Sequence, residues 1–177
     1  MYQSVLKFWF EEISPAQWWK VDPQFDRMIV ERFSTLHQQA TISELFDWRK
    51  EPGGRLAEII VLDQFSRNIH RGDGRAFAAD PLALALAQEA VAARVHKAFP
   101  IEQRVFLYMP YMHSESSAVH VVAEHLFKDT PKNNYDFELR HKAIIDRFGR
   151  YPHRNTMLGR QSTDEEIAFL AQPGSSF

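Results

Sequence analysis

Cysteine is absent from the 177-residue sequence, and glycine, with 7 residues, is scarce. Without a thiol, the chain can form no disulfide and no thiolate metal site, and it has no cysteine nucleophile. So few glycines disfavour a glycine-rich phosphate loop and a β fold with many tight turns. The motifs HExxH, GxGxxG and GxSxG and the P-loop are also missing, so the sequence carries none of these catalytic or nucleotide-binding signatures.

Long apolar runs and a strong charge of one sign are missing as well. No stretch approaches the roughly 18 apolar residues of a membrane span, and the N-terminus lacks the pattern of a secretory signal. The net charge of −2 argues against a nonspecific coat on nucleic acid. We therefore expect a cytoplasmic protein that binds neither membrane nor nucleic acid, and we expect no metal and no cofactor.

Helical spacing dominates what is present. Start signals occur at Asp22-Pro23 and Asp80-Pro81, a stop signal at Gly149, and a capping box at residues 162–166. The length predicts a single helical domain over residues 1–171 with a frayed tail at 172–177. Short connections predict an all-α fold of stacked antiparallel hairpins with about eight or nine helices. The expected helices lie near residues 4–11, 23–39, 43–49, 55–70, 82–95, 101–109, 116–128, 135–148 and 162–170.

The first polar interruption is LDQFSRNIHR, at residues 62–71, in a helix that is apolar on nearly every side. Such a helix is expected at the centre of a fold, so its polar groups must be paired. Asp63 and Arg67 lie four residues apart, which is close enough for a bond. One interpretation is a buried structural ion pair. The other is the floor of a pocket that offers a carboxylate, guanidinium groups and an amide from Gln64 or Asn68.

The second interruption is the string FLYMPYMHSES at residues 106–116. Pro110 removes a backbone donor and is predicted to disturb the helix. His, Ser and Glu follow at an expected helix start, where backbone N–H groups are free. One hypothesis makes His113 and Glu115 an acid/base pair. The alternative is that a serine of this turn caps the next helix and His113 is a structural histidine.

The third interruption is a loop at residues 148–160 that is dense in Arg, His and Asn. A rigid proline with several planar donors is typical of a binding element, and the alternative is a solvated surface loop. Residues 140–160 contain five Arg and one Lys against one Asp, a local charge of +5, so the remainder carries −7. Arginine suits bidentate recognition of a carboxylate or phosphate. In the helix before the loop, His141 lies within an apolar stripe and is expected in the core.

A family resemblance rests on three strings, LDQFSRNIHRGDGRAFAADPLAL, FLYMPYMHSES and IIDRFGRYPHRNTMLGRQST. They are similar to the bacterial family catalogued as domain of unknown function 924, and the likeness covers nearly the whole chain. The resemblance implies a tetratricopeptide-repeat-like fold and supplies no function. The chain departs from the family pattern at residues 116–120, where an acidic residue and an Asp-Gln pair are expected. The family signature falls on Asp63, Gln64, Arg67, Asn68, Arg71, Arg75, Phe77, Asp80, Pro110, His113, Ser114, Glu115, His141, Gly149, Arg150, Pro152, His153, Arg154, Asn155, Gly159 and Arg160.

Our leading hypothesis is a positively charged pocket for a small anionic ligand that bears a phosphate or a carboxylate. It combines the polar residues of all three interruptions with the histidine of the preceding helix. The ligand-binding candidates are Asp63, Gln64, Arg67, Asn68, Arg71, Arg75, His113, Glu115, His141, Arg150, His153, Arg154, Asn155 and Arg160.

Two other classes of function stay open. The first is a hydrolase or transferase that uses His113 or His153 as acid/base, with Asp63 and Glu115 as further catalytic candidates. The second is an adaptor that binds a protein or peptide partner in a groove between helices, with the polar residues forming a structural network of ion pairs. The sequence does not decide whether any reaction is catalysed.

Overall fold

The computed structural model describes residues 1–175, and this part of the chain contains helices and turns but no β-strand. Its α-helical stretches are α1 (Tyr2–Lys7), α2 (Pro23–Thr41), α3 (Pro52–Ile60), α4 (Ser66–Ile69), α5 (Asp80–Ala92), α6 (Ile101–Met112), α7 (Ser117–Phe127), α8 (Lys132–Phe148) and α9 (Asp164–Leu170). A π-helical turn, Val61–Phe65, joins α3 to α4 without a break. The predicted all-α fold with about eight or nine helices is confirmed.

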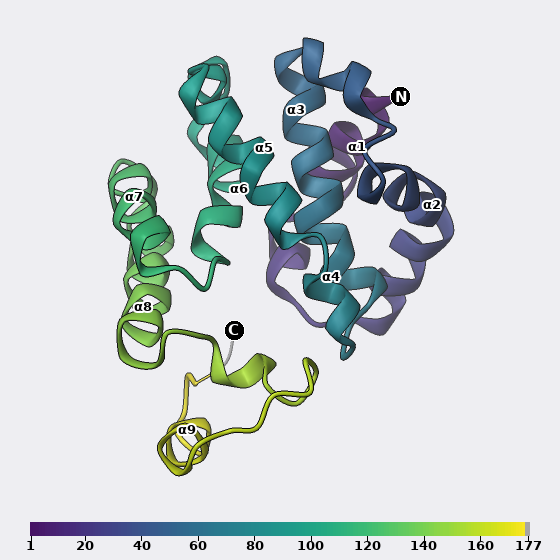
Figure 1. The fold of residues 1–177 in the computed structure, drawn as a ribbon. Helices are drawn as coiled ribbons and strands as arrows, with labels where there is room; N and C mark the ends of the chain where they lie inside the picture. Colours follow the sequence, from purple (N-terminus) through teal and green to yellow (C-terminus); the bar gives the residue numbers. More distant parts are fainter. Residues whose placement is uncertain (176–177) are drawn as a thin grey trace.

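The helices are arranged so that most neighbours in sequence are neighbours in space. Helix α5 packs on α6, α6 on α7 and α7 on α8, as expected for helical hairpins. In Figure 1, helices α1 to α4 occupy one side, α5 and α6 the middle, and α7 and α8 the other side. Helix α9 and the loop before it lie below them. The likeness to tetratricopeptide-repeat proteins stays a prediction.

The continuous helix formed by α3, the π-turn and α4 lies at the centre of the core. Every residue from 56 to 66 is buried, because α3 and the π-turn pack against α1, α2, α5 and α6. Next to it an aromatic cluster joins Trp9, Phe65 and Phe106, whose rings meet edge to face. Polar side chains on this helix are therefore held away from water, which makes their partners essential.

Several local signals act as predicted. The Asp22 carboxylate accepts bonds from the first N–H groups of α2, and Thr163 and Glu166 form a capping box on α9. Gly149 ends α8 with a φ of 68°, a conformation that glycine adopts without strain. Near the end of the chain, residues 172–175 form turns, with the Ser175 hydroxyl bonded to a backbone carbonyl, and residues 176 and 177 lie outside the described part.

One helix continues past its predicted end, and one correctly predicted helix start lacks a capping bond. Pro110 does not stop α6, which continues to Met112, because the proline lies in the last turn and residues 105–112 are all buried. Asp80 begins α5 but makes no capping bond; its carboxylate turns away to Arg67 instead. No helix among residues 1–175 is long and apolar enough to span a bilayer.

Candidate functional site

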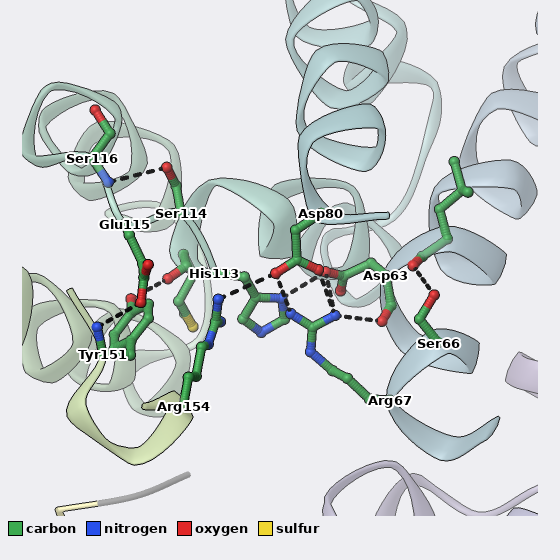
Figure 2. A network of polar contacts seen from close by, with 12 residues as sticks. Asp63, Ser66, Arg67, Asp80, His113, Ser114, Glu115, Ser116, Tyr151 and Arg154 are labelled. Carbon is green, nitrogen blue, oxygen red and sulfur yellow. Dashed lines mark hydrogen bonds and ion pairs between the residues drawn. The ribbon is translucent and has the colours of Figure 1, made fainter. Parts of the chain in front are cut away.

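The fully buried carboxylate of Asp63 is the first member of a polar network (Figure 2). Its Oδ1 lies 2.7 Å from Nδ1 of His113 and 3.2 Å from Nη1 of Arg67, and its Oδ2 accepts a 2.6 Å bond from the Gln64 amide. Burial alone would raise the pKa of Asp63. The charge of Arg67 and the contact with His113 outweigh burial, so the pKa of Asp63 lies well below its usual value. Asp63 is therefore a fixed negative charge inside the fold.

The neighbouring carboxylate, Asp80, joins two arginines from distant parts of the chain. Arg67 donates to both Asp80 oxygens at 3.0 and 3.1 Å, and also to the backbone carbonyl of Asp63. Arg154, from the loop after α8, reaches Asp80 with one 3.3 Å contact. Figure 2 shows the two guanidinium groups directed toward Asp80 from different elements. We call Asp63, Arg67, Asp80, His113 and Arg154 the centre.

Arg154 is the least well paired arginine of the centre. It is 6% exposed, and its guanidinium carbon lies 4.5 Å from the ring centroid of Phe77 and 4.6 Å from that of Tyr151. Its buried Nε has no hydrogen-bond partner among residues 1–175. Burial, followed by the like charge of Arg67, lowers the pKa of Arg154. A buried cation with one long ion pair and an unsatisfied N–H is energetically unfavourable.

Three histidines, His113, His141 and His153, lie in or beside the centre. The ring centroid of Tyr151 lies 5.7 Å from that of His141 and 5.5 Å from that of His153, and the His113 ring lies 6.5 Å from that of His141. Burial lowers the pKa of His141 to about 3 and that of His153 to about 4. Burial and Arg67 also lower the pKa of His113, although Asp63 acts in the opposite direction. All three imidazoles are therefore neutral at pH 7.

A second set of ion pairs, which we call the clamp, consists of Glu115, Arg150, Asn155, Arg160 and Glu166. Arg160 makes two bonds to Glu115, at 2.6 and 2.9 Å, and a third to the Asn155 side chain. Arg150 makes two bonds to Glu166, at 2.7 and 2.8 Å. The amide of Asn155 also donates to Glu166, at 3.3 Å. The clamp therefore binds the loop at residues 150–160 to α9 and to the turn before α7.

The centre and the clamp together are close to neutral. They contain four carboxylates and four guanidinium groups, 4 − 4 = 0, with the His113 imidazole uncharged. Carboxylates from elsewhere meet four of the five excess positive charges of residues 140–160, since Asp80, Glu115, Glu165 and Glu166 each accept bonds from one arginine of this segment. The predicted pocket is thus a neutral array of charges rather than a positive one.

Some predicted site residues lie apart from this network. Asn68 and Arg71 both bond Asp26 of α2, and Arg75 bonds Asp73 on the surface with 70% of its side chain exposed. The other candidates, apart from Gln64, His141 and His153, belong to the centre or the clamp. Gln64 bonds Asp63, and the two histidines lie next to the centre.

The site hypothesis missed Asp80, Tyr151 and Glu166. Asp80 and Glu166 looked like ordinary helix-start residues, because acidic residues are favoured in the first turn. Tyr151 is fully buried and donates its hydroxyl to the Met112 carbonyl at 2.6 Å. In the sequence, its place directly before Pro152 in the third interruption is the one signal that could have pointed to it.

A surface hollow with a volume of about 710 Å³ lies away from the centre. It lies between α2 and the segment from α4 to the start of α5. Its lining residues are Ser34, Thr35, His37, Gln38, Thr41, Ile69, His70, Arg75, Ala78, Ala79 and Leu82. Only one predicted site residue, Arg75, lines it.

Residues 1–175 contain no cluster of three or more His, Asp or Glu side chains that could hold a metal ion. His120, whose spacing to Glu124 suits a ligand pair, bonds instead to the buried Glu138 at 2.7 Å and to the Ser114 carbonyl at 2.9 Å. Its imidazole is therefore part of the packing between α7 and α8.

These features define an all-α protein whose central helix carries a buried network of Asp, Arg and His. The model of the family described as bacterial protein of unknown function (DUF924) matches residues 5–174, and the chain belongs to this family. The predicted resemblance is thereby confirmed. A solved structure of a protein of unknown function from Agrobacterium tumefaciens is similar, with 34% sequence identity, 96% of each chain covered and a TM-score of 0.92. No curated protein matches the chain.

Proposed function

We propose that this protein binds a small anionic ligand, bearing a phosphate or a carboxylate, at the centre beside Arg154. The observation that carries the proposal is the poor pairing of this arginine. Arg154 is buried and has one 3.3 Å contact to a carboxylate, and its Nε has no partner within the described part of the chain. An anion that accepts bonds from its guanidinium group would remove the cost of that unsatisfied charge.

The surroundings support an anion at this place. Arg67 supplies a second guanidinium group. Burial is the main cause of the lowered pKa of His153, and the charges of Arg154 and Arg67 lower this pKa further, which supports the view that both arginines lie near His153. The electrostatic attraction of an anion is stronger here than at the surface, because the groups are shielded from water. The neutral imidazole of His113 offers hydrogen bonding without adding a charge that would have to be compensated.

Partial exposure supports access to the centre. The side chains of His113, Asp80 and Arg67 are 14%, 17% and 21% exposed, whereas Asp63 is covered almost completely. The clamp supports the rigidity that a binding site requires, since it fixes the loop that carries His153 and Arg154. We infer that a ligand would reach the centre along the side of these three partly exposed residues.

Binding of inorganic phosphate by the purified full-length chain tests the proposal. At constant ionic strength, replacing chloride by 20 mM phosphate is expected to raise the unfolding temperature of the wild type, because a ligand that binds only the folded state stabilises it. Arg154→Gln is expected to abolish the shift. Arg75→Gln, a matched change at an exposed arginine outside the network, is expected to keep it.

Isothermal titration with phosphate then separates binding from stability. Each variant is first shown by circular dichroism to be folded at the titration temperature. Arg154→Lys keeps the charge without the planar fork and is expected to weaken binding about tenfold. An equal phosphate response in Arg154→Gln and the wild type, or no response in the wild type to either phosphate or citrate, would overturn the proposal.

A further inference from the structure

The contact between Asp63 and His113 has a consequence for the other nitrogen of the imidazole. Asp63 is ionised and offers only acceptor oxygens, so the 2.7 Å contact requires a proton on Nδ1 of His113. A neutral imidazole carries one proton, and therefore Nε2 carries a lone pair. Nε2 makes no hydrogen bond with any residue that the structure describes.

The position of this nitrogen places it at the proposed anion site. Figure 2 shows the His113 ring between the guanidinium groups of Arg67 and Arg154, with one ring nitrogen turned to Asp63 and the other turned away. Besides burial, Arg67 lowers the pKa of His113, and Arg154, His113 and Arg67 each lower the pKa of His153, which agrees with this proximity. A ligand anion on Arg154 would thus lie next to an unprotonated nitrogen whose tautomer is fixed.

We propose that Asp63 and His113 form a general-base dyad that hydrolyses a small ester whose anionic group is held by Arg154. Nε2 of His113 takes a proton from water while the water oxygen forms a bond to the carbonyl carbon of the ester. The bond from that carbon to the alkoxy oxygen then breaks, and the imidazolium returns the proton to the leaving alkoxide. The products are an acid and an alcohol, and no other reactant is needed.

The two arginines have a second role in this reaction, because negative charge develops on the carbonyl oxygen in the transition state. We assign the role of base to His113 because the carboxylate of Asp63 fixes its tautomer, whereas burial lowers the pKa of His153 to about 4. Asp63 is a positioning residue that fixes the tautomer of His113. This inference rests on the proposed anion site, and its test is designed to fail separately from that proposal.

Alkylation by iodoacetate and by its neutral analogue iodoacetamide tests the dyad directly. The chain has no cysteine, so the usual target of both reagents is missing. Attack by Nε2 forms a carbon–nitrogen bond and releases iodide. At pH 7, we expect iodoacetate to modify His113 at least tenfold faster than any of the other seven histidines, and at least tenfold faster than iodoacetamide does. Peptide mass spectrometry locates the product, and phosphate is expected to protect His113.

The Arg154→Gln variant and the two reagents test the anion site and the proposed base independently. Arg154→Gln is expected to reduce the iodoacetate rate to the iodoacetamide rate and to leave the latter unchanged. If phosphate binds but His113 reacts with neither reagent faster than surface histidines do, the dyad is wrong and the anion site stands. If His113 reacts fast and equally with both reagents, the base is supported and the anion site is wrong.

The role of Asp63 has its own readout. Nitrogen-15 chemical shifts are expected to report a proton on Nδ1 of His113 in the wild type and a shift toward the Nε2-protonated tautomer in Asp63→Asn. The iodoacetate rate is expected to fall at least tenfold in that variant, with the pH midpoint of the reaction lowered. An unchanged tautomer with an unchanged pH midpoint would exclude a positioning role.

Turnover is measured with a 4-nitrophenyl ester that carries a free carboxylate, against neutral 4-nitrophenyl acetate. We expect the carboxylated ester to be hydrolysed at least tenfold faster than the neutral one. His113→Gln is expected to lose at least about 100-fold of this rate. Equal rates for the two esters, or an unchanged rate in His113→Gln, would overturn the proposed hydrolysis.

Discussion

The centre and the clamp use the same residue types in different ways. In the clamp, Arg150 and Arg160 each place two donors on one carboxylate at 2.6–2.9 Å. In the centre, Arg67 and Arg154 share Asp80, and the contact of Arg154 is 3.3 Å long. The clamp is a saturated set of ion pairs, and the centre is not.

This difference separates what holds the fold from what can bind a ligand. In a saturated pair, both oxygens of the carboxylate already accept bonds from the facing arginine, so removal of either partner affects stability. An arginine that is buried without full pairing stabilises the fold little and has donors that an anion can use. The arginine content of the sequence did not distinguish these two uses, because the distinction depends on which carboxylate each arginine meets.

The largest predicted effect concerns the clamp. Glu166, which is 2% exposed, accepts bonds from Arg150, Asn155 and the backbone N–H of Thr163. Glu166→Ala is expected to lower the free energy of unfolding by about 3 kcal/mol, because it leaves a cation and two donors without their acceptor. Urea denaturation followed by circular dichroism measures the loss.

The neighbouring residue is the control. Glu165 pairs with Arg147 on the surface, and 64% of its side chain is exposed. Glu165→Ala is expected to leave the urea midpoint almost unchanged, because exposed ion pairs contribute little. Hydrogen exchange is expected to show faster exchange of residues 150–170 in Glu166→Ala. Equal losses in the two variants would mean that the clamp is not a stabilising unit.

Local signals were enough to predict the helices but not the pairing in the site. Asp22-Pro23, Gly149 and the capping box at Thr163 act through neighbouring residues, so the sequence placed them correctly. Asp63 was expected to bond Arg67 four residues away, and that contact exists at 3.2 Å. Arg67 makes its two-bond contact with Asp80, which belongs to α5. Helical spacing does not predict this contact, because it depends on how α4 and α5 are placed in the fold.

The second prediction compares the pH dependence of His141, which lies next to the centre, with that of the clamp. An unfolded histidine takes up a proton near pH 6.5, whereas His141 in the folded state does so only at about pH 3. Between these values the unfolded state binds more protons, so stability falls as the pH falls. Glu166, whose pKa is lowered to about 2 chiefly by its bond to Arg150, loses its contribution only below about pH 4.5.

Acidification from pH 6.5 to pH 5 is therefore expected to weaken the packing around His141 and to leave the ion pairs of the clamp intact. His141→Gln removes one such histidine and is expected to reduce the loss of stability over this range by about 1.5 kcal/mol. Urea denaturation at both pH values measures the loss. Glu165→Ala is the control and is expected to lose as much stability between the two pH values as the wild type does. A wild-type stability that is constant from pH 6.5 to pH 5 would contradict the prediction.

The smallest predicted effect on stability is at Arg154 itself. Arg154→Met is expected to change the free energy of unfolding by no more than about 1 kcal/mol, because Arg67 still pairs with Asp80 and the thioether fits between the rings of Phe77 and Tyr151. Arg150→Met is expected to destabilise more, because it deprives the buried Glu166 of two bonds. Urea midpoints of the two variants test this order. If Arg154→Met were the more destabilising change, Arg154 would be a structural residue like Arg150, and the distinction between a saturated clamp and an unsaturated centre would fail. With the predicted order, loss of phosphate binding in Arg154→Met could not be attributed to unfolding.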